Sequence, residues 1–165
     1  MEKKSYKLGI VPGSFDPITV GHLDMILRAT KMCEHVVVAV MINSSKKYSF
    51  TLDERKRIAE AALADVDRVE VVASDGMLFE LAEALSADLI IKGVRNKRDL
   101  EYEKMMAEYN STRTSAVTVL LDASESVREI SSTAVRKIME KGELPESLLP
   151  AGAINEIKKI LASEK

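Results

Sequence analysis

Short apolar runs alternate with amphipathic runs along most of the chain. The apolar runs, several of them rich in valine and isoleucine, predict buried strands at residues 8–11, 35–42, 68–73, 88–92 and 116–121. The amphipathic runs predict helices at about residues 21–33, 51–64, 77–86, 99–111, 131–141 and 153–162. Because strands and helices alternate, we expect a parallel sheet with right-handed crossovers and helices on both faces. The predicted fold class is therefore α/β, a doubly wound domain.

Two of these helices carry capping signals in the sequence. Thr51 with Glu54 three positions later forms a capping-box pattern. Ser131 or Ser132 is expected to cap the helix that ends before Gly142, since serine oxygens accept from free backbone N–H groups.

The composition is that of an ordinary globular chain. With 165 residues, 46% hydrophobic and 30% charged, we expect a single domain spanning residues 1–165. The net charge of −2 lacks the basic excess that general nucleic-acid binding requires. We expect no membrane span and no signal peptide, because the apolar runs are too short for either. The single cysteine, Cys33, is expected in the core, and its solitary presence suits a reducing cytoplasm.

The stretch from Gly13 to His22, GSFDPITVGH, joins the first predicted strand to the first predicted helix. In a parallel sheet this turn lies at the carboxyl end of the strand, where ligands bind. A helix N-terminus offers unpaired backbone N–H groups and the positive end of a dipole, which suit an anion. Gly13 and Gly21 permit close approach to the backbone, and His22 is placed to donate to a phosphate oxygen. A purely structural turn with His22 at the helix cap is the alternative.

Cationic and hydroxyl side chains follow the later strands as well. Lys46 follows the second predicted strand, Lys92 and Arg95 follow the fourth, and residues 131–133 follow the fifth. The carboxyl ends of parallel strands share one edge of the sheet, so these groups together suit a polyphosphate. Taken singly, each has a simpler explanation: a solvated charge for Lys46, Arg95 and Glu103, an Asx turn for Asp16, and a helix cap for residues 131–133.

Five segments carry a resemblance to a known family. They read GSFDPITVGH, SKK after the second predicted strand, KGVR at the end of the fourth, DLEYE, and ISST before the penultimate helix. In this order they resemble the bacterial phosphopantetheine adenylyltransferases, within the nucleotidyltransferase superfamily that carries a T/H-x-G-H motif. The resemblance covers nearly the whole chain. It implies a single Rossmann-like domain with a five-stranded parallel sheet in the order 3-2-1-4-5, in which the loops after Val11 and Lys92 face each other across one crevice.

The resemblance also implies a reaction and its partners. The adenylyl group of ATP would pass to 4′-phosphopantetheine, giving dephospho-coenzyme A and pyrophosphate, in coenzyme A biosynthesis. Mg²⁺ would arrive with ATP, because this ion prefers phosphates and water to a protein cage. A homohexamer is implied, with the segment from Tyr102 to Tyr109, including Met105 and Met106, as the candidate contact.

Two other functions remain open at this point. A nicotinamide-mononucleotide adenylyltransferase or a small cytidylyltransferase is the nearest alternative, although Thr19 stands where those enzymes typically carry histidine. A nucleotide-binding regulator that kept the fold and lost catalysis is the alternative from a different class.

The roles of the family's site residues are implied at the matching positions of this chain. The implied catalytic residues are His22, Lys46 and Arg95. The implied ATP contacts are Ser14, Phe15, His22, Gly93, Val94, Arg95, Glu103, Val127, Arg128, Glu129, Ile130, Ser131, Ser132 and Thr133. The implied acceptor contacts are Ser14, Lys46, Leu78 and Lys92.

Two places depart from the family pattern. Lys92 stands where many relatives have arginine, which keeps the charge but loses the bidentate fork. Residues 127–129 replace an aromatic-Ser-aromatic run that is common before the serine-rich segment, and Arg128 adds a cation there. Thr133 replaces a serine and keeps the hydroxyl.

Overall fold

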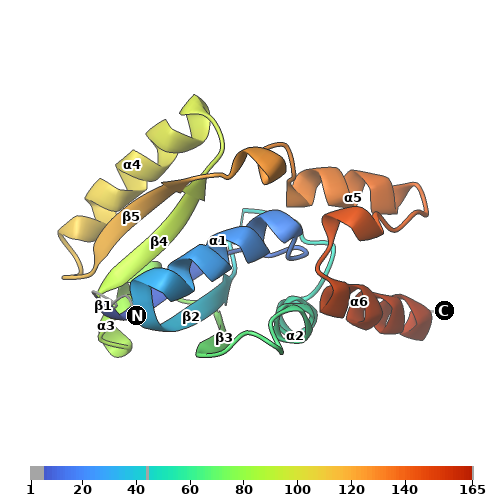
Figure 1. Cartoon of the computed structure of the whole chain (residues 1–165), viewed down its shortest axis with the longest axis horizontal. Helices are drawn as coiled ribbons and strands as arrows, with labels where there is room; N and C mark the ends of the chain where they lie inside the picture. Colours follow the sequence, from blue (N-terminus) through green and yellow to red (C-terminus); the bar gives the residue numbers. More distant parts are fainter. Residues whose placement is uncertain (1–5, 44, 165) are drawn as a thin grey trace.

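The computed structural model describes residues 6–43 and 45–164, and within them one five-stranded parallel sheet forms the centre of the fold (Figure 1). Its strands are β1 (Tyr6–Gly13), β2 (Cys33–Met41), β3 (Val69–Ser74), β4 (Leu89–Val94) and β5 (Val117–Asp122). Their order is β3-β2-β1-β4-β5, which confirms the implied topology. The first five residues, part of the segment behind the signal-peptide prediction, lie outside the described residues, as does Ser44 of the loop after β2.

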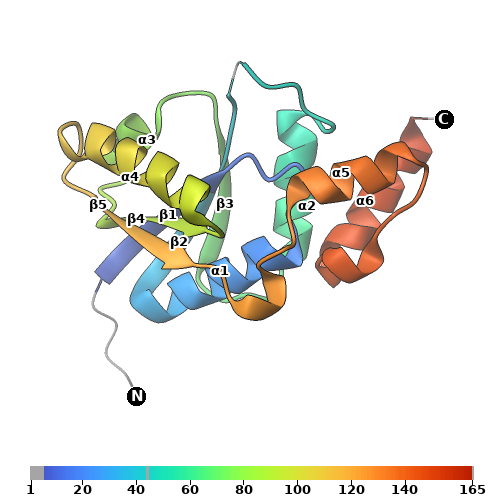
Figure 2. The same ribbon diagram turned by 90° about the horizontal axis from the view of Figure 1, so that it is seen from above.

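Helices connect successive strands and continue beyond the sheet. They are α1 (Val20–Met32), α2 (Leu52–Ala62), α3 (Leu78–Ala84), α4 (Lys97–Ser111), α5 (Ser132–Glu140) and α6 (Ala151–Ser163). Two short 3-10 turns, η1 (Glu125–Val127) and η2 (Glu146–Leu148), precede α5 and α6. Seen from above, α1 lies on one face of the sheet, and α3 and α4 lie on the other (Figure 2).

The two faces of the sheet bury separate apolar clusters, because alternate residues of a strand point to opposite sides. Val11, Val38 and Ile91 pack on the side of α1 and α2, in a cluster that extends to α5 and α6. Ile10 and Ile90 pack on the side of α3. The central strands are thus buried on both faces, as their continuous apolar runs predict.

Helices α5 and α6 lie at the end of the molecule opposite α4 (Figures 1 and 2). Helix α6 packs closely against α2, since a Cβ at Gly152 would overlap the carbonyl oxygen of Ala61. Glycine permits this contact because it has no side chain.

Some predicted boundaries differ from the observed ones. Cys33, predicted to end the first helix, begins β2, because its extended backbone already pairs with Tyr6 of β1. It is buried, as expected. The last helix begins at Ala151, directly after Pro150, and not at residue 153. Both capping predictions are confirmed, with Thr51 and Glu54 exchanging hydrogen bonds and Ser131, not Ser132, as the cap of α5.

Candidate active site

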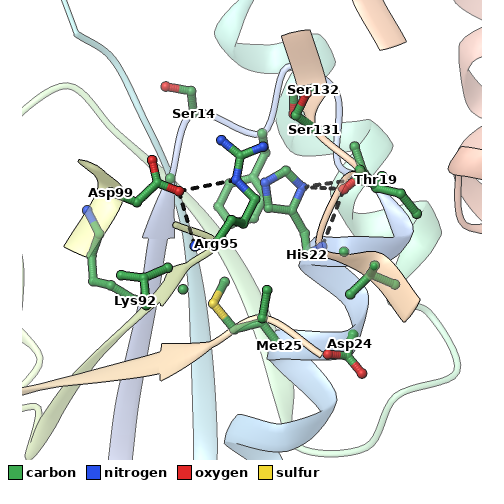
Figure 3. Close-up of a pocket in the computed structure, with 18 of the residues that line it drawn as sticks. Ser14, Thr19, His22, Asp24, Met25, Lys92, Arg95, Asp99, Ser131 and Ser132 are labelled. Carbon is green, nitrogen blue, oxygen red and sulfur yellow. Dashed lines mark hydrogen bonds and ion pairs between the residues drawn. The ribbon is translucent and has the colours of Figure 1, made fainter. Parts of the chain in front are cut away.

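A cavity of about 370 Å³ opens at the carboxyl edge of the sheet (Figure 3). It lies where the loop after β1 meets the loop after β4, the point at which the strand order reverses. The N-terminal ends of α1 and α5 also line it. The cavity is lined by these predicted site residues: Ser14, Phe15, His22, Lys46, Lys92, Gly93, Val94, Arg95, Glu103, Val127, Ile130, Ser131, Ser132 and Thr133.

His22 is held at the mouth of α1 by Thr19. The backbone N–H of Thr19 donates to Nδ1 of His22 at 2.9 Å, and the backbone N–H of His22 donates to Oγ1 of Thr19 at 3.3 Å. A backbone N–H cannot accept, so Nδ1 carries no proton and the neutral ring carries its proton on Nε2. Burial, and secondarily the charge of Arg95, lowers the pKa of His22 to about 4. At neutral pH the ring is therefore an uncharged donor.

Asp16 has a role other than the Asx turn considered from the sequence. Its buried carboxylate accepts from the backbone N–H groups of Ser49 at 2.8 Å and Phe50 at 3.0 Å. These residues end the loop that carries Lys46. Asp16 is therefore a cross-link between the loops after β1 and β2, which leaves both carboxylate oxygens engaged with protein.

Arg55 of α2 completes this cross-link and was missed by the sequence analysis. Its guanidinium is buried and donates to the carbonyl oxygens of Ser14 at 2.7 Å, Met41 at 3.0 Å and Phe50 at 3.2 Å. The ring of Tyr48 stacks on it, with the guanidinium carbon 3.9 Å from the ring centroid. The two ends of the Lys46 loop are thus fixed on one arginine.

Lys92 and Glu103 form an ion pair across the cavity wall. Nζ of Lys92 lies 3.0 Å from Oε2 of Glu103, and both side chains are largely buried. Glu103 is therefore not a free surface charge of α4. Any anion that reached Lys92 would have to compete with this carboxylate for the ammonium group.

Arg95 follows β4 and is oriented by Asp99. The Asp99 carboxylate accepts from both the backbone N–H and Nε of Arg95, each at 3.2 Å. The Nη end of the guanidinium remains directed toward Ser14 and His22 across the cavity (Figure 3). Asn96 caps α4 by accepting from the backbone N–H of Asp99 at 2.8 Å.

The N-terminus of α5 forms the opposite wall. Oγ of Ser131 accepts from the N–H of Ala134 at 3.1 Å, and Oγ of Ser132 donates to the carbonyl of Pro17 at 2.9 Å. Arg136, one turn further along α5, also lines the cavity and donates to the carbonyl of Asp16 at 2.9 Å. Sequence reasoning missed Arg136, although its spacing of four from Ser132 places both on one helix face.

Three predicted site residues lie outside the cavity lining: Leu78, Arg128 and Glu129. Leu78 begins α3 and packs on the apolar cluster of the other sheet face. Glu129 is exposed. The guanidinium of Arg128 donates to protein acceptors, the carbonyls of Arg95 and Ala123 and the carboxylate of Asp122.

The acidic groups that line the cavity are engaged, Asp16 with backbone, Asp24 with Ser124, Asp99 with Arg95 and Glu103 with Lys92. Among residues 6–43 and 45–164, no group of three or more His, Cys, Asp or Glu side chains is arranged to hold a metal ion. This donor set fits a divalent ion that is held chiefly by nucleotide phosphates and water, the ligands that Mg²⁺ favours.

Among the described residues 6–43 and 45–164, no helix is long and apolar enough to span a bilayer.

A family model described as cytidylyltransferase-like matches residues 10–138, from β1 through most of α5. The matched region includes the second half of β1, all of the other four strands and both helix N-termini that line the cavity. The fold and the site thus define a nucleotidyltransferase of the cytidylyltransferase-like class.

Sequence comparison with individual enzymes identifies the family within this class. The phosphopantetheine adenylyltransferase of Flavobacterium johnsoniae is 40% identical over 141 residues, covering 86% of this chain and 93% of the relative. That of Limosilactobacillus fermentum is 40% identical over 91% of this chain and 87% of the relative. That of Clostridium perfringens is 38% identical over 95% of this chain and 96% of the relative. The chain belongs to the phosphopantetheine adenylyltransferase family.

Two solved structures of a bifunctional NMN adenylyltransferase/ADP ribose pyrophosphatase from Francisella tularensis share the fold, each with a TM-score of 0.65. They are 17% and 15% identical to this chain and match 89% and 88% of it; the second is complexed with AMP and a manganese ion. The matches span 46% and 45% of those longer chains.

Proposed function

We propose that His22, Lys46 and Arg95 catalyse the reaction of this family in the cavity at the switch point of the sheet. The reaction transfers the adenylyl group of ATP to 4′-phosphopantetheine. It yields dephospho-coenzyme A and pyrophosphate, in coenzyme A biosynthesis. The observation that carries the proposal is the convergence of these three side chains with the N-termini of α1 and α5 on one cavity. Such a set of donors and positive charges suits the charge of a triphosphate.

The reaction needs no nucleophile from the protein. The acceptor phosphate is an anion near pH 7 and attacks the α-phosphorus directly, so no base has to remove a proton first. The task of the site is to align this oxygen with the phosphorus and to stabilise the charge on the equatorial and leaving oxygens. The cavity supplies fixed donors and cations for both purposes.

His22 acts in this scheme as a neutral donor. With Nδ1 occupied by Thr19, the Nε2–H group is available to an oxygen of the reacting phosphate. Burial lowers the pKa of His22 to about 4, which favours this neutral form at neutral pH. His22 therefore stabilises phosphate charge by donating a hydrogen bond.

The remaining residues divide between the two substrates. Arg95 and the residues from Ser131 to Thr133 hold the β and γ phosphates, while Ser14, Phe15, Gly93, Val94, Glu103, Val127 and Ile130 form the rest of the nucleotide site. Lys46 approaches the acceptor phosphate and the reacting centre, and Lys92 and Leu78 serve the acceptor. Mg²⁺ bound with ATP supplies further neutralisation of phosphate charge.

The testing experiment measures pyrophosphate release by the purified chain with Mg-ATP and either 4′-phosphopantetheine or nicotinamide mononucleotide. Release with the pantetheine acceptor alone is expected. Release with the nucleotide alone would identify a different acceptor, and ATP binding without release in either case would favour a nucleotide-binding regulator. A His22→Ala variant with unchanged turnover and normal ATP binding would exclude His22 from the chemistry.

We also propose that the chain forms a homohexamer through the face of α4. Tyr102, Met105 and Tyr109 expose 54%, 60% and 38% of their surface on this helix, and Val117 on the neighbouring edge strand exposes 61%. Large apolar side chains gathered on one surface are typical of a subunit contact. Analytical ultracentrifugation of the wild type and of Met105→Glu tests this, with dissociation of the variant expected.

A further inference from the structure

Arg128 lies in the segment that departs from the family pattern, just before α5. Its guanidinium makes four hydrogen bonds to the protein. Nη1 donates to the carbonyl of Arg95 at 2.8 Å and to Oδ1 of Asp122 at 3.0 Å. Nη2 donates to Oδ2 of Asp122 at 2.9 Å and to the carbonyl of Ala123 at 2.9 Å.

These contacts leave little of Arg128 for a ligand. A guanidinium carries five N–H groups, and the four on Nη1 and Nη2 match the four acceptors. The fifth, on Nε, lies 3.6 Å from the carboxylate of Glu125. The paired Asp122 has a lowered pKa, caused first by its hydrogen bond from Arg128, so this bidentate pair persists at neutral pH.

The groups that accept hydrogen bonds from Arg128 lie at the carboxyl ends of two neighbouring strands, β4 and β5. Arg95 follows β4, whereas Asp122 ends β5 and Ala123 follows it. The ladder between the two strands ends with the N–H of Ala123 donating to the carbonyl of Val94 at 2.8 Å. Arg128 extends this connection by one residue and fixes the carbonyl of Arg95.

Arg95 is consequently held on both sides of its Cα atom. Asp99 accepts from its N–H and its Nε, and Arg128 donates to its carbonyl oxygen. The direction of the Arg95 side chain is thereby determined before a nucleotide arrives. A guanidinium that is already oriented loses less freedom on binding a phosphate than one on a free loop.

We propose that Arg128 is a positioning residue that orients Arg95 toward the nucleotide phosphates and does not itself contact ATP. The proposal rests on the role given above to Arg95. It assigns a positioning task to an arginine for which the family resemblance implies direct contact with ATP.

The test compares ATP binding and turnover in Arg128→Ala, Arg95→Ala and the double variant. We expect Arg128→Ala to raise both Kd and KM for ATP about tenfold, the effect of one weakened charge-assisted hydrogen bond. KM for the acceptor should stay unchanged, because Lys92 is paired with Glu103 and the loop that carries Lys46 is held by Asp16, neither of which contacts Arg128. In the Arg95→Ala background, Arg128→Ala should change ATP affinity by less than about twofold.

Three further measurements separate positioning from general damage to the fold. Arg128→Lys keeps the charge but cannot bridge four acceptors, so it should reproduce the loss of ATP affinity. Asp122→Asn removes the bidentate carboxylate partner, leaves Arg128 itself unchanged and should give a smaller loss of ATP affinity. Arg98→Ala, an exposed arginine on α4, is the matched control and should bind ATP as the wild type does.

An unchanged affinity for ATP in both Arg128 variants would overturn the proposal. Losses that add fully in the double variant would also overturn it, since they would mean that Arg128 meets the nucleotide itself or acts elsewhere. Calorimetric ATP binding reads out the coupling without turnover. A failure of the proposed reaction, seen as absence of pyrophosphate release by the wild type, is therefore distinguishable from a failure of this inference.

Discussion

Thr19 and His22 exchange two hydrogen bonds, so that the imidazole takes the place that a glutamate side chain has in an ordinary capping box. Glutamate in this position would cap the helix equally well but would direct a second carboxylate oxygen at the phosphates. Histidine caps through Nδ1 and keeps a donor on the opposite side of its ring. The threonine and the histidine of the T-x-G-H motif are thus one structural unit.

Replacement of His22 separates capping from chemistry. His22→Glu should retain the stability of α1, whereas His22→Ala should lose about 1 kcal/mol of unfolding free energy with the cap. Both variants should lose turnover, by about 10²- to 10³-fold, because neither offers a donor at the position of Nε2. Urea unfolding together with pyrophosphate release checks both parts. A His22→Glu variant of near-normal activity would contradict the neutral-donor role.

The lowered pKa of His22 predicts a pH dependence of stability. Between pH 4 and 6.5 the unfolded chain binds a proton at this residue and the folded chain does not, so stability rises with pH across this window. The loss on acidification from 6.5 to 4 is expected to approach about 3 kcal/mol from this group. Urea unfolding at a series of pH values measures it. The same series on His22→Gln, which has no titrating ring, should be flatter by this amount.

Arg55 is expected to be essential for stability. Arg55→Met should lower the free energy of unfolding by about 3–5 kcal/mol, since it leaves three carbonyl oxygens without their buried donor. Arg57→Met, at a half-exposed arginine two residues later, is the control and should change stability by less than about 1 kcal/mol. Equal effects of the two changes would show that the buried network is not what stabilises this region.

Substitution of Lys92 should change KM for 4′-phosphopantetheine more than KM for ATP. Lys92→Met is expected to raise KM for 4′-phosphopantetheine at least about tenfold, through loss of a charge-assisted contact. Lys92→Arg, which restores a bidentate fork, should lower that KM below the wild-type value. Steady-state kinetics with each substrate varied in turn makes the comparison, with exposed Lys97→Met as the control. A change confined to KM for ATP would place Lys92 in the nucleotide site.

The order and type of the elements could be predicted from the sequence because burial on both faces gives strands a continuous apolar pattern. The strand order came from the family resemblance, since periodicity carries no information on which strands are neighbours. The cavity lining could be predicted for Arg95, which directly follows β4, and for His22, which lies at the start of the helix after β1. Asp16, Arg55 and Arg136 could not be assigned, because their partners lie tens of residues away in the sequence.

The hydrogen-bond partners of Arg128 could not be predicted either, because sequence alone does not show which residues lie near it in space. A cation next to a serine-rich helix start suggests a phosphate ligand, and only the positions of Asp122 and the Arg95 carbonyl in space direct its donors elsewhere. Leu78 lies at the start of α3, on the other face of the sheet and outside the cavity lining, so its contact with the acceptor stays a prediction.

The walls of the cavity come from segments spread between Pro12 and Arg136. During synthesis, a chain that has emerged only as far as β4 has the His22 turn and the Lys46 loop but lacks the wall formed by α5. Nucleotide binding is thus a property acquired late in translation, when most of the sheet has already been made. A chain truncated before α5 would lack the residues from Ser131 to Arg136 that complete this cavity.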